Sequence, residues 1–224
     1  MYKLSYFTEE EDEKVLEFIK KNPFAVITGK GDKYPVATHI PLDINIQPDT
    51  ANSKVKSQNY TLTFTGHMMK NTDHHKAFEK DSNVLVIFTG PHCFVSANWY
   101  PGEVSASTWN YVTVHAKGKI KFTDEKATVE IVKAITDKYE GTVSRVAFNK
   151  LPEEYVNRLV KAIVGFTIEV ESIENVFKLS QNHPEEIRDN IIEQLEKRGD
   201  YNSTEIASAM RTTKSAKIKT PDTP

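Results

Sequence analysis

The sequence has one cysteine, and this scarcity excludes several kinds of site. Cys93 alone cannot form an internal disulfide, nor can it build a zinc site that needs several thiolates. It lies in the apolar stretch VLVIFTGPHCFV, which favours a small buried side chain over a nucleophile. We therefore expect Cys93 to have a structural role.

The chain also lacks long apolar runs and a strong net charge. Its apolar stretches, such as NVLVIF, are far shorter than the ~18 residues that a membrane span needs. The opening residues MYKLSYFTEEEDEK do not resemble a signal peptide, so a cytoplasmic protein is expected. A net charge of −2 gives no overall attraction to nucleic acid or to an anionic membrane.

Several catalytic and ligand-binding motifs are missing as well. The sequence lacks GxGxxG and GxxxxGK[ST], so it predicts neither a Rossmann nor a P-loop nucleotide site, and GxSxG and HExxH are absent too. Seven histidines are present, but His74 and His75 are adjacent and would point about 100° apart on a helix. No metal site is predicted, and no catalytic residue can be assigned.

In the first two thirds of the sequence, apolar and polar residues alternate with a period of two. Alternating or buried-strand patterns, separated by short turns, occur at 24–29, 36–44, 60–67, 83–90, 92–100 and 110–123, with further strands in VGFTIEVESIE and FKLS. About seven strands with hairpin-scale connections predict a closed or nearly closed antiparallel barrel.

Helical patterns surround these strands. A helix is expected to end before Asn22-Pro23, with a capping box formed by Thr8 and Glu11. Further helices are predicted in KNTDHHKAFEKD, in DEKATVEIVKAITDKYEG with Gly141 as C-cap, in PEEYVNRLVKAI, and in a terminal pair, PEEIRDNIIEQLEKRG and STEIASAM. The predicted organisation is a barrel domain with inserted helices over 1–180, a helical extension packed on it over 181–212, and a disordered tail over 213–224.

The stretch TGHMMKNTDHH, residues 65–75, admits three interpretations: a metal site, a phosphate-binding turn, or polar side chains that lie on the surface without a ligand. The phosphate interpretation draws on Gly66, on the donors Lys70 and Asn71, and on the start of a helix. A capped loop without a ligand explains the same residues. His74 and His75 are expected to be exposed helix residues.

Two further groups of residues could contact a ligand. Trp99 and Trp109 flank a loop of small and polar residues, which suits a flat heteroaromatic ligand, a dimer interface or the barrel core. The stretch KLSQNHPEE supplies more side-chain donors and acceptors, among them Lys178, Ser180 and Gln181, than the capping of one helix requires.

Several collinear segments resemble the PaiB-type FMN-binding proteins, which belong to the flavin-binding split-barrel superfamily. The most specific motifs are GPH followed by SxxWY, and TWNYVxVHxxG. The matching segments are NPFAVITG, PVATHIPL, GHMMKN, VLVIFTGPHCFVSANWY, TWNYVTVHAKGKI, AIVGFTIEVESIE and FKLSQNHPEEIR. One departure is His183, where the family more usually has arginine.

The resemblance implies a mainly β protein with flanking helices (α+β): an antiparallel Greek-key split β-barrel that forms a homodimer and binds FMN. By the same resemblance His67, Lys70 and Asn71 would hold the phosphate, and Thr38 and His39 would border the ribityl chain or the ring. The remaining implied contacts, which flank the isoalloxazine, are Trp109, Asn110, Lys178, Ser180 and Gln181.

Some members of this family are described as negative regulators of transcription, so the resemblance implies a regulator or a flavin-dependent sensor. A flavin-dependent oxidoreductase is the alternative, and a haem-binding split barrel is a more distant one. The terminal helix pair looks superficially like a helix-turn-helix. Its second helix carries only Arg211, however, so packing is the favoured interpretation and DNA is a weakly supported partner.

Overall fold

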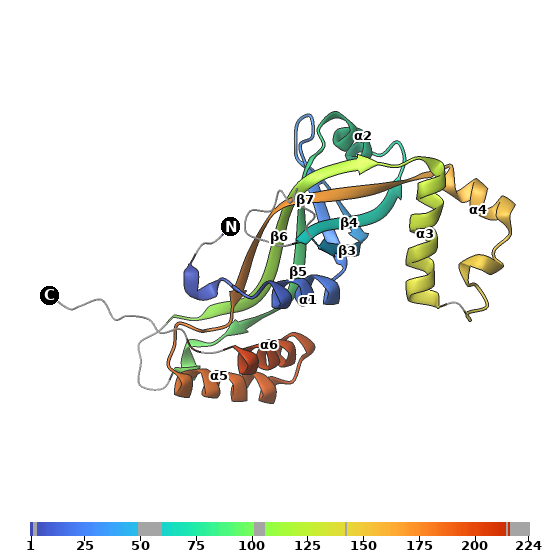
Figure 1. The fold of residues 1–224 in the computed structure, drawn as a ribbon. Helices are drawn as coiled ribbons and strands as arrows, with labels where there is room; N and C mark the ends of the chain where they lie inside the picture. The colour runs from blue at the N-terminus through green and yellow to red at the C-terminus, as the bar shows by residue number, and fades with distance from the viewer. Residues whose placement is uncertain (2–3, 49–59, 101–105, 142, 214, 216–224) are drawn as a thin grey trace. The chain divides into compact units, whose positions relative to one another are not determined.

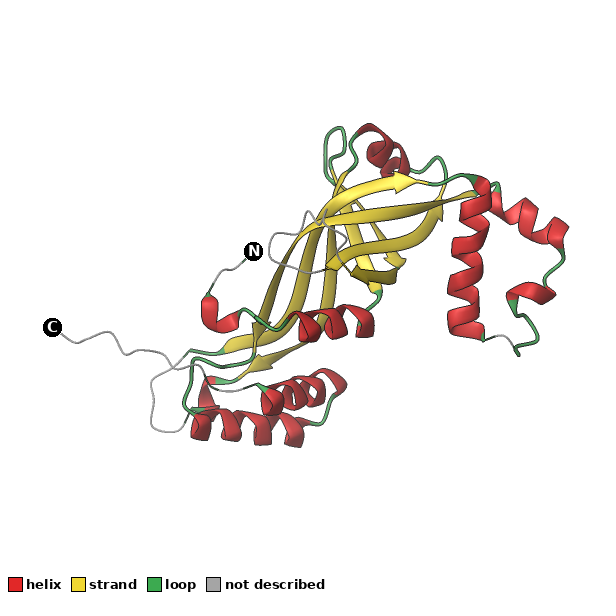
Figure 2. Cartoon of the chain, viewed as in Figure 1, coloured by secondary structure: helices red, strands yellow, loops and turns green. Residues whose placement is uncertain are grey.

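The computed structural model describes residues 1, 4–48, 60–100, 106–141, 143–213 and 215 (Figures 1 and 2). Most of the predicted tail over 213–224 and most of the polar loop near residues 47–59 lie outside these residues. The described chain divides into two compact units. Unit 1 comprises residues 1–18, 89–114 and 174–224, and unit 2 comprises residues 19–88 and 115–173. The predicted domain division at residue 180 stays a prediction.

Seven strands of the described chain form one sheet in the order β2-β1-β5-β6-β7-β4-β3. Every pairing with a defined register is antiparallel. The strands are β1 (Phe24–Gly29), β2 (Val36–Pro41), β3 (Asp43–Pro48), β4 (Tyr60–Met69), β5 (Asn83–Val95), β6 (Thr108–Phe122) and β7 (Ile163–Lys178). The sheet curls into a half-barrel, which confirms the predicted split-barrel fold (Figure 2).

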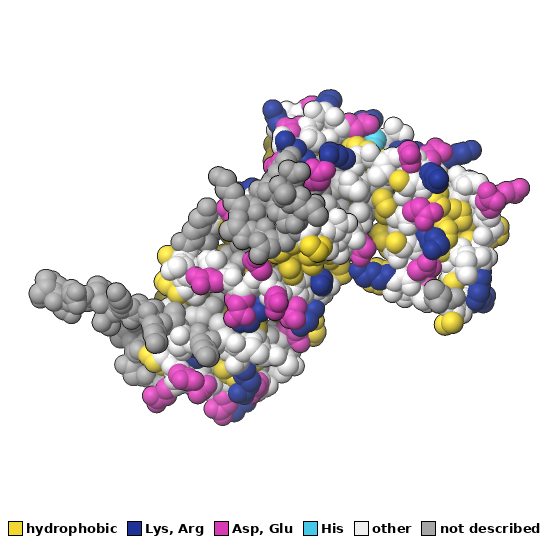
Figure 3. Space-filling view, in the orientation of Figure 1, with side chains coloured by type: hydrophobic (Ala, Val, Ile, Leu, Met, Phe, Trp, Pro, Cys, Tyr) yellow, Lys and Arg dark blue, Asp and Glu magenta, His cyan; other side chains and the backbone are white. Residues whose placement is uncertain are grey.

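The helices follow the predicted positions closely. They are α1 (Asp12–Lys21), α2 (Asp73–Lys80), α3 (Glu125–Glu140), α4 (Glu153–Val160), α5 (Glu185–Arg198) and α6 (Tyr201–Thr212), with short 3-10 turns η1 (Ser5–Phe7), η2 (Ala97–Trp99) and η3 (Phe148–Lys150). Gly141 is the C-cap of α3, as predicted. Hydrophobic side chains remain exposed on the α3–α4 part of unit 2, including Tyr139, Tyr155 and Leu159 (Figure 3).

The core of unit 2 is built from alternate strand residues. On β4, Leu62, Phe64 and Met68 are buried while their neighbours are partly exposed. Phe64 packs edge-on against Phe88 of β5, with ring centroids 5.2 Å apart. Because successive strand residues point to opposite faces, this pattern determines which polar side chains of β4 can meet a ligand.

The core of unit 1 includes the pair of helices α5 and α6, which lie side by side (Figure 1). Ile191 and Leu195 of α5 and Ile206 of α6 are fully buried. Asp200 caps α6, because its carboxylate accepts a hydrogen bond from the Ser203 amide at 3.0 Å. The pair is therefore held by packing, as the favoured interpretation of the sequence predicted.

Several local predictions were wrong. Residues 83–95 form one strand rather than two, and VGFTIEVESIE and FKLS join into the single strand β7. The stretch 92–100 leaves the sheet after Val95, because residues 97–99 form a 3-10 turn. The expected capping box also does not form: α1 begins at Asp12, and the Glu11 amide donates to Glu9 Oε1 at 3.0 Å.

Gly66 lies inside β4, which continues to Met69, so it is not part of the turn on which the phosphate interpretation draws. A Cβ at this position would lie 2.8 Å from Cζ of Phe166 and 3.2 Å from Cδ2 of Leu42, both of which are fully buried. The glycine is thus required by the packing of β4 against the core rather than by close approach of an anion.

Replacing Gly66 with alanine should lower the free energy of unfolding by about 1–3 kcal/mol, since the added methyl overpacks the contact with Phe166. Urea denaturation measures this change. Thr61→Ala, at an exposed position of the same strand, is the control and should cost less than ~1 kcal/mol. An unchanged midpoint for the Gly66 variant would contradict the tight packing.

Candidate functional site

The residues predicted to bind a ligand lie in both units of the chain, and each group is described by itself. Unit 2 contains Thr38, His39, His67, Lys70 and Asn71, on β2, at the end of β4 and in the turn before α2. Unit 1 contains Trp109, Asn110, Lys178, Ser180 and Gln181, at the start of β6 and the end of β7.

In unit 2 the turn between β4 and α2 carries the predicted phosphate donors. Asn71 is exposed and has a φ of 65°, a left-handed conformation that asparagine tolerates better than most residues. The Lys70 backbone amide donates to the Ala162 carbonyl at 2.9 Å, which anchors the turn to the segment before β7. The Lys70 ammonium lies 4.0 Å from Glu125 Oε1 in a partly exposed pair. Such a pair is weak, so the ammonium can turn toward an anion.

The first turn of α2 does not offer free backbone amides in the way the sequence interpretation assumed. The His75 amide donates to the Thr72 hydroxyl at 3.3 Å, and the His74 amide donates to the Asp73 carboxylate at 2.7 Å. These caps satisfy the donors that would otherwise attract an anion to a helix start. A phosphate at this turn would therefore be held by side chains.

His67 has an unusual environment among the predicted donors. Its Nδ1 atom is buried and has no hydrogen-bond partner among the described residues. Burial lowers the pKa of His67, because desolvation disfavours the imidazolium. Burial thus favours the neutral imidazole, whose Nδ1 atom is left without a partner among the described residues.

Thr38 and His39 occupy consecutive positions of β2 and so face opposite sides of the sheet. Thr38 pairs with Ile27 of β1 and His39 pairs with Val26. His39 is exposed and Thr38 is only partly so. Within unit 2, β2 contacts β4, and a Cβ on Gly66 would lie 3.4 Å from Ile40. Both residues are therefore close in the fold to the end of β4, but only one of the two side chains can face a given ligand.

In unit 1 the structure brings Asn110, Lys178 and Ser180 into one cavity of about 320 Å³, here called the Lys178 pocket. Its other lining residues come from the N-terminal segment, the segment before β6 and the segment after β7: Tyr6, Phe7, Tyr100, Ala106, Ser107, Thr108, Asn182 and His183. The sequence interpretation missed Tyr6 and Phe7, because nothing in their local pattern indicates that η1 reaches this cavity.

A buried hydrogen-bonded pair forms the base of this pocket. Asn110 is fully buried although its neighbours on the inner face of β6, Val112 and Val114, are apolar. Its amide nitrogen donates to the Ser180 hydroxyl at 2.9 Å and lies 3.5 Å from the sulfur of Met210. Ser180 has a φ of 59°, a strained conformation for serine that the bond to Asn110 helps to hold.

Lys178 ends β7 at the wall of the pocket. Its ammonium donates to the hydroxyl of Thr108 and to the carbonyl of Trp109, the latter at 2.8 Å. It also lies 5.8 Å from the centre of the Phe7 ring. Burial lowers the pKa of Lys178, since no carboxylate among the described residues forms an ion pair with it.

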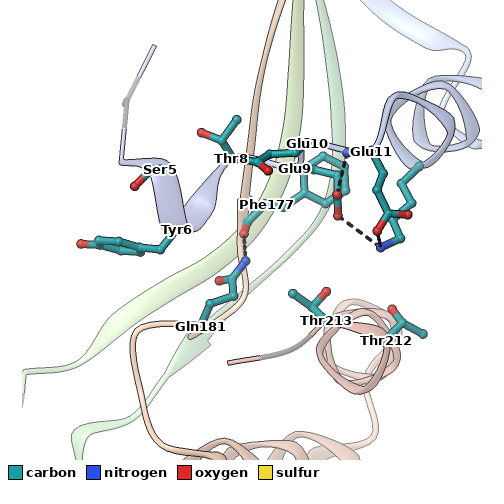
Figure 4. Close-up of a pocket in the computed structure, with 11 residues that line it drawn as sticks. Ser5, Tyr6, Thr8, Glu9, Glu10, Glu11, Phe177, Gln181, Thr212 and Thr213 are labelled. Atoms are coloured by element: carbon teal, nitrogen blue, oxygen red, sulfur yellow. Dashed lines mark hydrogen bonds and ion pairs between the residues drawn. The ribbon is translucent and has the colours of Figure 1, made fainter. Parts of the chain in front are cut away.

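Gln181 and Trp109 lie outside the Lys178 pocket. Gln181 lines a neighbouring cavity of about 410 Å³ with Glu9, Glu10 and Glu11, here called the acidic pocket (Figure 4). The Gln181 amide is occupied there by the backbone, because Nε2 donates to the Phe177 carbonyl and Oε1 accepts from the Leu179 amide. Trp109 is 53% exposed and lines a shallow cavity with His92 and Tyr111.

The cysteine and the adjacent histidines have structural environments. Cys93 is buried, as predicted, and burial raises the pKa of its thiol to about 11, which leaves little thiolate. The prediction that His74 and His75 are exposed was wrong. His75 is only 8% exposed and packs on Phe122 with ring centroids 4.7 Å apart. The His74 ring is hydrogen-bonded to Thr72 and Asp73.

The side chains at the end of β4 fit a phosphomonoester. Lys70 provides an ammonium, Asn71 an exposed amide, and His67 an unsatisfied ring nitrogen, all within five residues of unit 2. A phosphate with two negative charges and several acceptor oxygens matches this set of donors.

A curled antiparallel sheet with this strand order is the split-barrel fold. The chain belongs to the family described as "Putative FMN-binding domain", whose model matches residues 1–172. The resemblance to PaiB-type proteins is thereby confirmed, and FMN is the cofactor that the family assigns. The chain is also 34% identical, over 211 residues, to the protease synthase and sporulation protein PAI 2 of Bacillus subtilis, covering 94% of this chain and 96% of that protein.

Solved structures show the same fold at low sequence identity. The FAD and heme binding protein from Mycobacterium smegmatis matches with a TM-score of 0.54 and 13% identity, covering 76% of this chain and 73% of that one. The flavocytochrome Anf3 from Azotobacter vinelandii matches with a TM-score of 0.55 and 12% identity, covering 79% and 72%. Within the described residues, no helix is long and apolar enough to cross a membrane.

His67 should make the protein less stable in mild acid. Its folded pKa lies below the ordinary value of about 6.5, so the unfolded chain binds more protons as the pH falls through that value. His67 therefore has no effect on the free energy of unfolding above pH ~6.5 and lowers this free energy progressively below that pH. His67→Gln should flatten this part of the stability profile, measured by urea denaturation between pH 7.5 and 5. His92→Gln, at an exposed position, is the control, and an identical profile for the wild type and the His67 variant would refute the assignment.

Proposed function

We propose that this protein binds FMN as a homodimer and acts as a flavin-dependent sensor or transcriptional regulator. Membership of the FMN-binding family is the observation that carries the proposal. The donor set of His67, Lys70 and Asn71 supports it, because these side chains suit the FMN phosphate. A cytoplasmic location is part of the same proposal.

In this proposal the two groups of residues have different tasks. Lys70, Asn71 and His67 hold the phosphate, and His39 or Thr38 borders the ribityl chain. Trp109, Asn110, Lys178, Ser180 and Gln181 belong to the ring end of the cofactor, as the family resemblance implies. Trp109 suits stacking on the flavin ring because its side chain is exposed. The Gln181 side chain is hydrogen-bonded to the backbone and forms part of the wall of the acidic pocket.

The regulatory role rests on the relative from Bacillus subtilis, whose name connects it with protease synthesis and sporulation. The geometry of α6 argues against a recognition helix in the usual sense. Arg211, the basic residue near its end, forms a two-pronged ion pair with Glu196 of α5, with nitrogen to oxygen distances of 2.8 and 3.0 Å. A flavin-dependent change of dimer geometry therefore fits this chain better than direct readout of bases by α6.

A flavin-dependent oxidoreductase is the second candidate. The Lys178 pocket favours it, because an enzyme needs room for a second molecule and a side chain that carries a proton. FMN, when bound, supplies the redox chemistry, while Lys178 and Asn110 can orient a substrate and stabilise charge through hydrogen bonds.

Replacing Lys70 with alanine should weaken the binding of FMN about tenfold or more and that of riboflavin less than twofold, since only FMN carries a phosphate. Flavin fluorescence quenching measures both dissociation constants. Lys76→Ala, an exposed lysine of α2, is the matched control and should leave both unchanged. Equal losses for FMN and riboflavin would remove Lys70 from the phosphate site, and failure of the wild type to bind FMN would refute the proposed function.

A regulator and an enzyme predict different behaviour of the FMN-loaded protein. As a regulator it should be a dimer by analytical ultracentrifugation and should retard its upstream promoter DNA in a gel-shift assay, with a difference between oxidised and reduced flavin. As an enzyme it should oxidise a reduced nicotinamide catalytically and leave DNA mobility unchanged. DNA retardation without turnover supports the regulator, and turnover without retardation supports the oxidoreductase.

A further inference from the structure

One buried side chain, Thr128, fastens the start of α3 to the sheet, where α3 follows β6 and lies beside the start of β7 (Figure 1). Its hydroxyl donates to the Asp124 carbonyl at 2.7 Å, accepts from the Gly165 amide at 2.9 Å and lies 3.1 Å from the Thr123 hydroxyl. A hydroxyl has one proton and two lone pairs, so these three bonds use its full capacity and make Thr123 the donor. Thr128 is 1% exposed and is the one buried residue of α3, which the structure describes in full.

Gly165 connects this helix start to the proposed phosphate donors, because it pairs with His67 across β4 and β7. Its amide donates to Thr128, and its carbonyl accepts from the Thr123 amide at 2.9 Å, so both backbone groups point away from β4. Facing residues of antiparallel strands that exchange no hydrogen bonds form the closest pairs, with Cα atoms about 4.5 Å apart. His67 therefore lies directly beside the residue that Thr128 holds.

The first turns of α3 also cover the face of the sheet on which His67 lies. A Cβ on Gly165 would lie 2.9 Å from Cδ1 of Ile131 and 3.1 Å from Cα of Thr128, so α3 packs directly on this glycine. Side chains of directly opposed strand residues point to the same face of a sheet, so the His67 ring shares the face that α3 covers. This cover accounts for the burial that lowers the pKa of His67.

The start of α3 meets the second proposed donor, Lys70, through a carboxylate. The Lys70 ammonium lies 4.0 Å from Oε1 of Glu125, the first residue of α3. The Lys70 amide is anchored to the Ala162 carbonyl, three residues before Gly165, so its backbone depends on the same part of β7. A phosphate that approaches Lys70 meets the Glu125 carboxylate and competes with it for the ammonium.

We propose that Thr128 is a positioning residue of the FMN phosphate site and that Glu125 limits the affinity of this site for phosphate. Thr128 acts through the backbone of Gly165 and does not touch the ligand. Glu125 acts through Lys70, because its negative charge opposes that of the incoming phosphate. The inference rests on the proposed function, since it assumes that the donors at the end of β4 hold the phosphate of FMN.

Thr136 of the same helix provides a matched comparison. Its side chain is half-buried, and its hydroxyl donates to the Val132 carbonyl at 2.8 Å. This bond stays within α3, whereas those of Thr128 extend to β7. The two threonines therefore allow one substitution to be made with and without the link to the phosphate donors.

The first test needs no flavin. In the full chain without FMN, the His67 ring proton signal, identified by its loss in His67→Gln, should titrate below about 6.5 in proton NMR. Thr128→Val retains the shape of the side chain but removes its hydrogen bonds, so it should loosen α3 from Gly165 and raise this midpoint toward 6.5. Thr128→Ser, which retains the hydroxyl, and Thr136→Val should keep the wild-type midpoint. A folded Thr128→Val protein with the wild-type midpoint overturns the role of Thr128.

The second test compares FMN with riboflavin by flavin fluorescence quenching. Thr128→Val should weaken the binding of FMN about three- to tenfold, less than the loss of a charged donor itself, and that of riboflavin less than twofold. Thr128→Ser should restore the wild-type preference, and Thr136→Val should not disturb it. Equal weakening of both flavins in Thr128→Val would indicate a general structural defect and overturn the positioning role.

A surface variant tests the site without disturbing buried contacts. Glu125 is exposed, and Glu125→Gln should strengthen the binding of FMN about two- to fivefold at low salt, the range of an exposed ion pair, with riboflavin unchanged. Added salt should reduce this gain, because it screens the charge. Glu130→Gln, at another exposed position of α3, is the control. Unchanged FMN affinity in Glu125→Gln, or an equal gain for riboflavin, overturns the proposal even if Thr128→Val fails to fold.

Failure of this inference can be told apart from failure of the proposed function. If the wild type prefers FMN to riboflavin and none of the α3 variants changes that preference, the proposed function stands and the inference is refuted. If the wild type binds no FMN, the proposed function is refuted, and the roles of Thr128 and Glu125 in phosphate binding are refuted with it.

Discussion

The two-residue period of the long strands is the constraint on which the rest of the structure depends. On β4 it turns Gly66 and Met68 toward the core and His67 away from the Gly66 side. On β6 it buries Asn110 and leaves Trp109 exposed. The candidate ligand residues within the strands owe their accessibility to the parity of their positions. Consecutive residues that look like one motif in the sequence, such as Trp109 and Asn110, consequently serve two different surfaces.

Buried polar groups shape the candidate sites. Asn110 and Ser180 are satisfied by each other, so they stabilise a defined geometry at the base of the Lys178 pocket. Arg188 of α5 is also buried, and it donates to the carbonyl of Met210 at the end of α6. His67 and Lys178 differ, because a ring nitrogen of the one and the charge of the other have no matching partner among the described residues. Incomplete satisfaction of this kind is what a binding site requires before its ligand arrives.

The fold was predictable wherever one local pattern dominated. The helix over Glu125–Glu140 with Gly141 as its cap, and the strands of β1 and β4, follow from periodicity and from capping chemistry. The errors occurred where tertiary pairing overrides a local break. Gly90 and Pro91 look like the end of a strand, yet β5 continues through them, and Glu174 and Asn175 do not interrupt β7. Of the candidate site, the phosphate donors of the β4–α2 turn stay a prediction from the sequence and the family resemblance, whereas no local sequence pattern indicates that Tyr6 and Phe7 line the Lys178 pocket.

By itself the sequence determined the class of the protein: an antiparallel barrel without a metal-binding or nucleotide-loop motif, with a family likeness strong enough to name FMN. These properties depend on the alternation of apolar and polar residues and on the order of motifs along the chain, both of which can be read from the sequence. Only the tertiary structure decided which polar residues share a cavity. Asn110, Lys178 and Tyr6 line one cavity because strand pairing and η1 bring distant segments together. Electrostatic balance in a pocket depends on distances in space, which spacing along the chain does not specify.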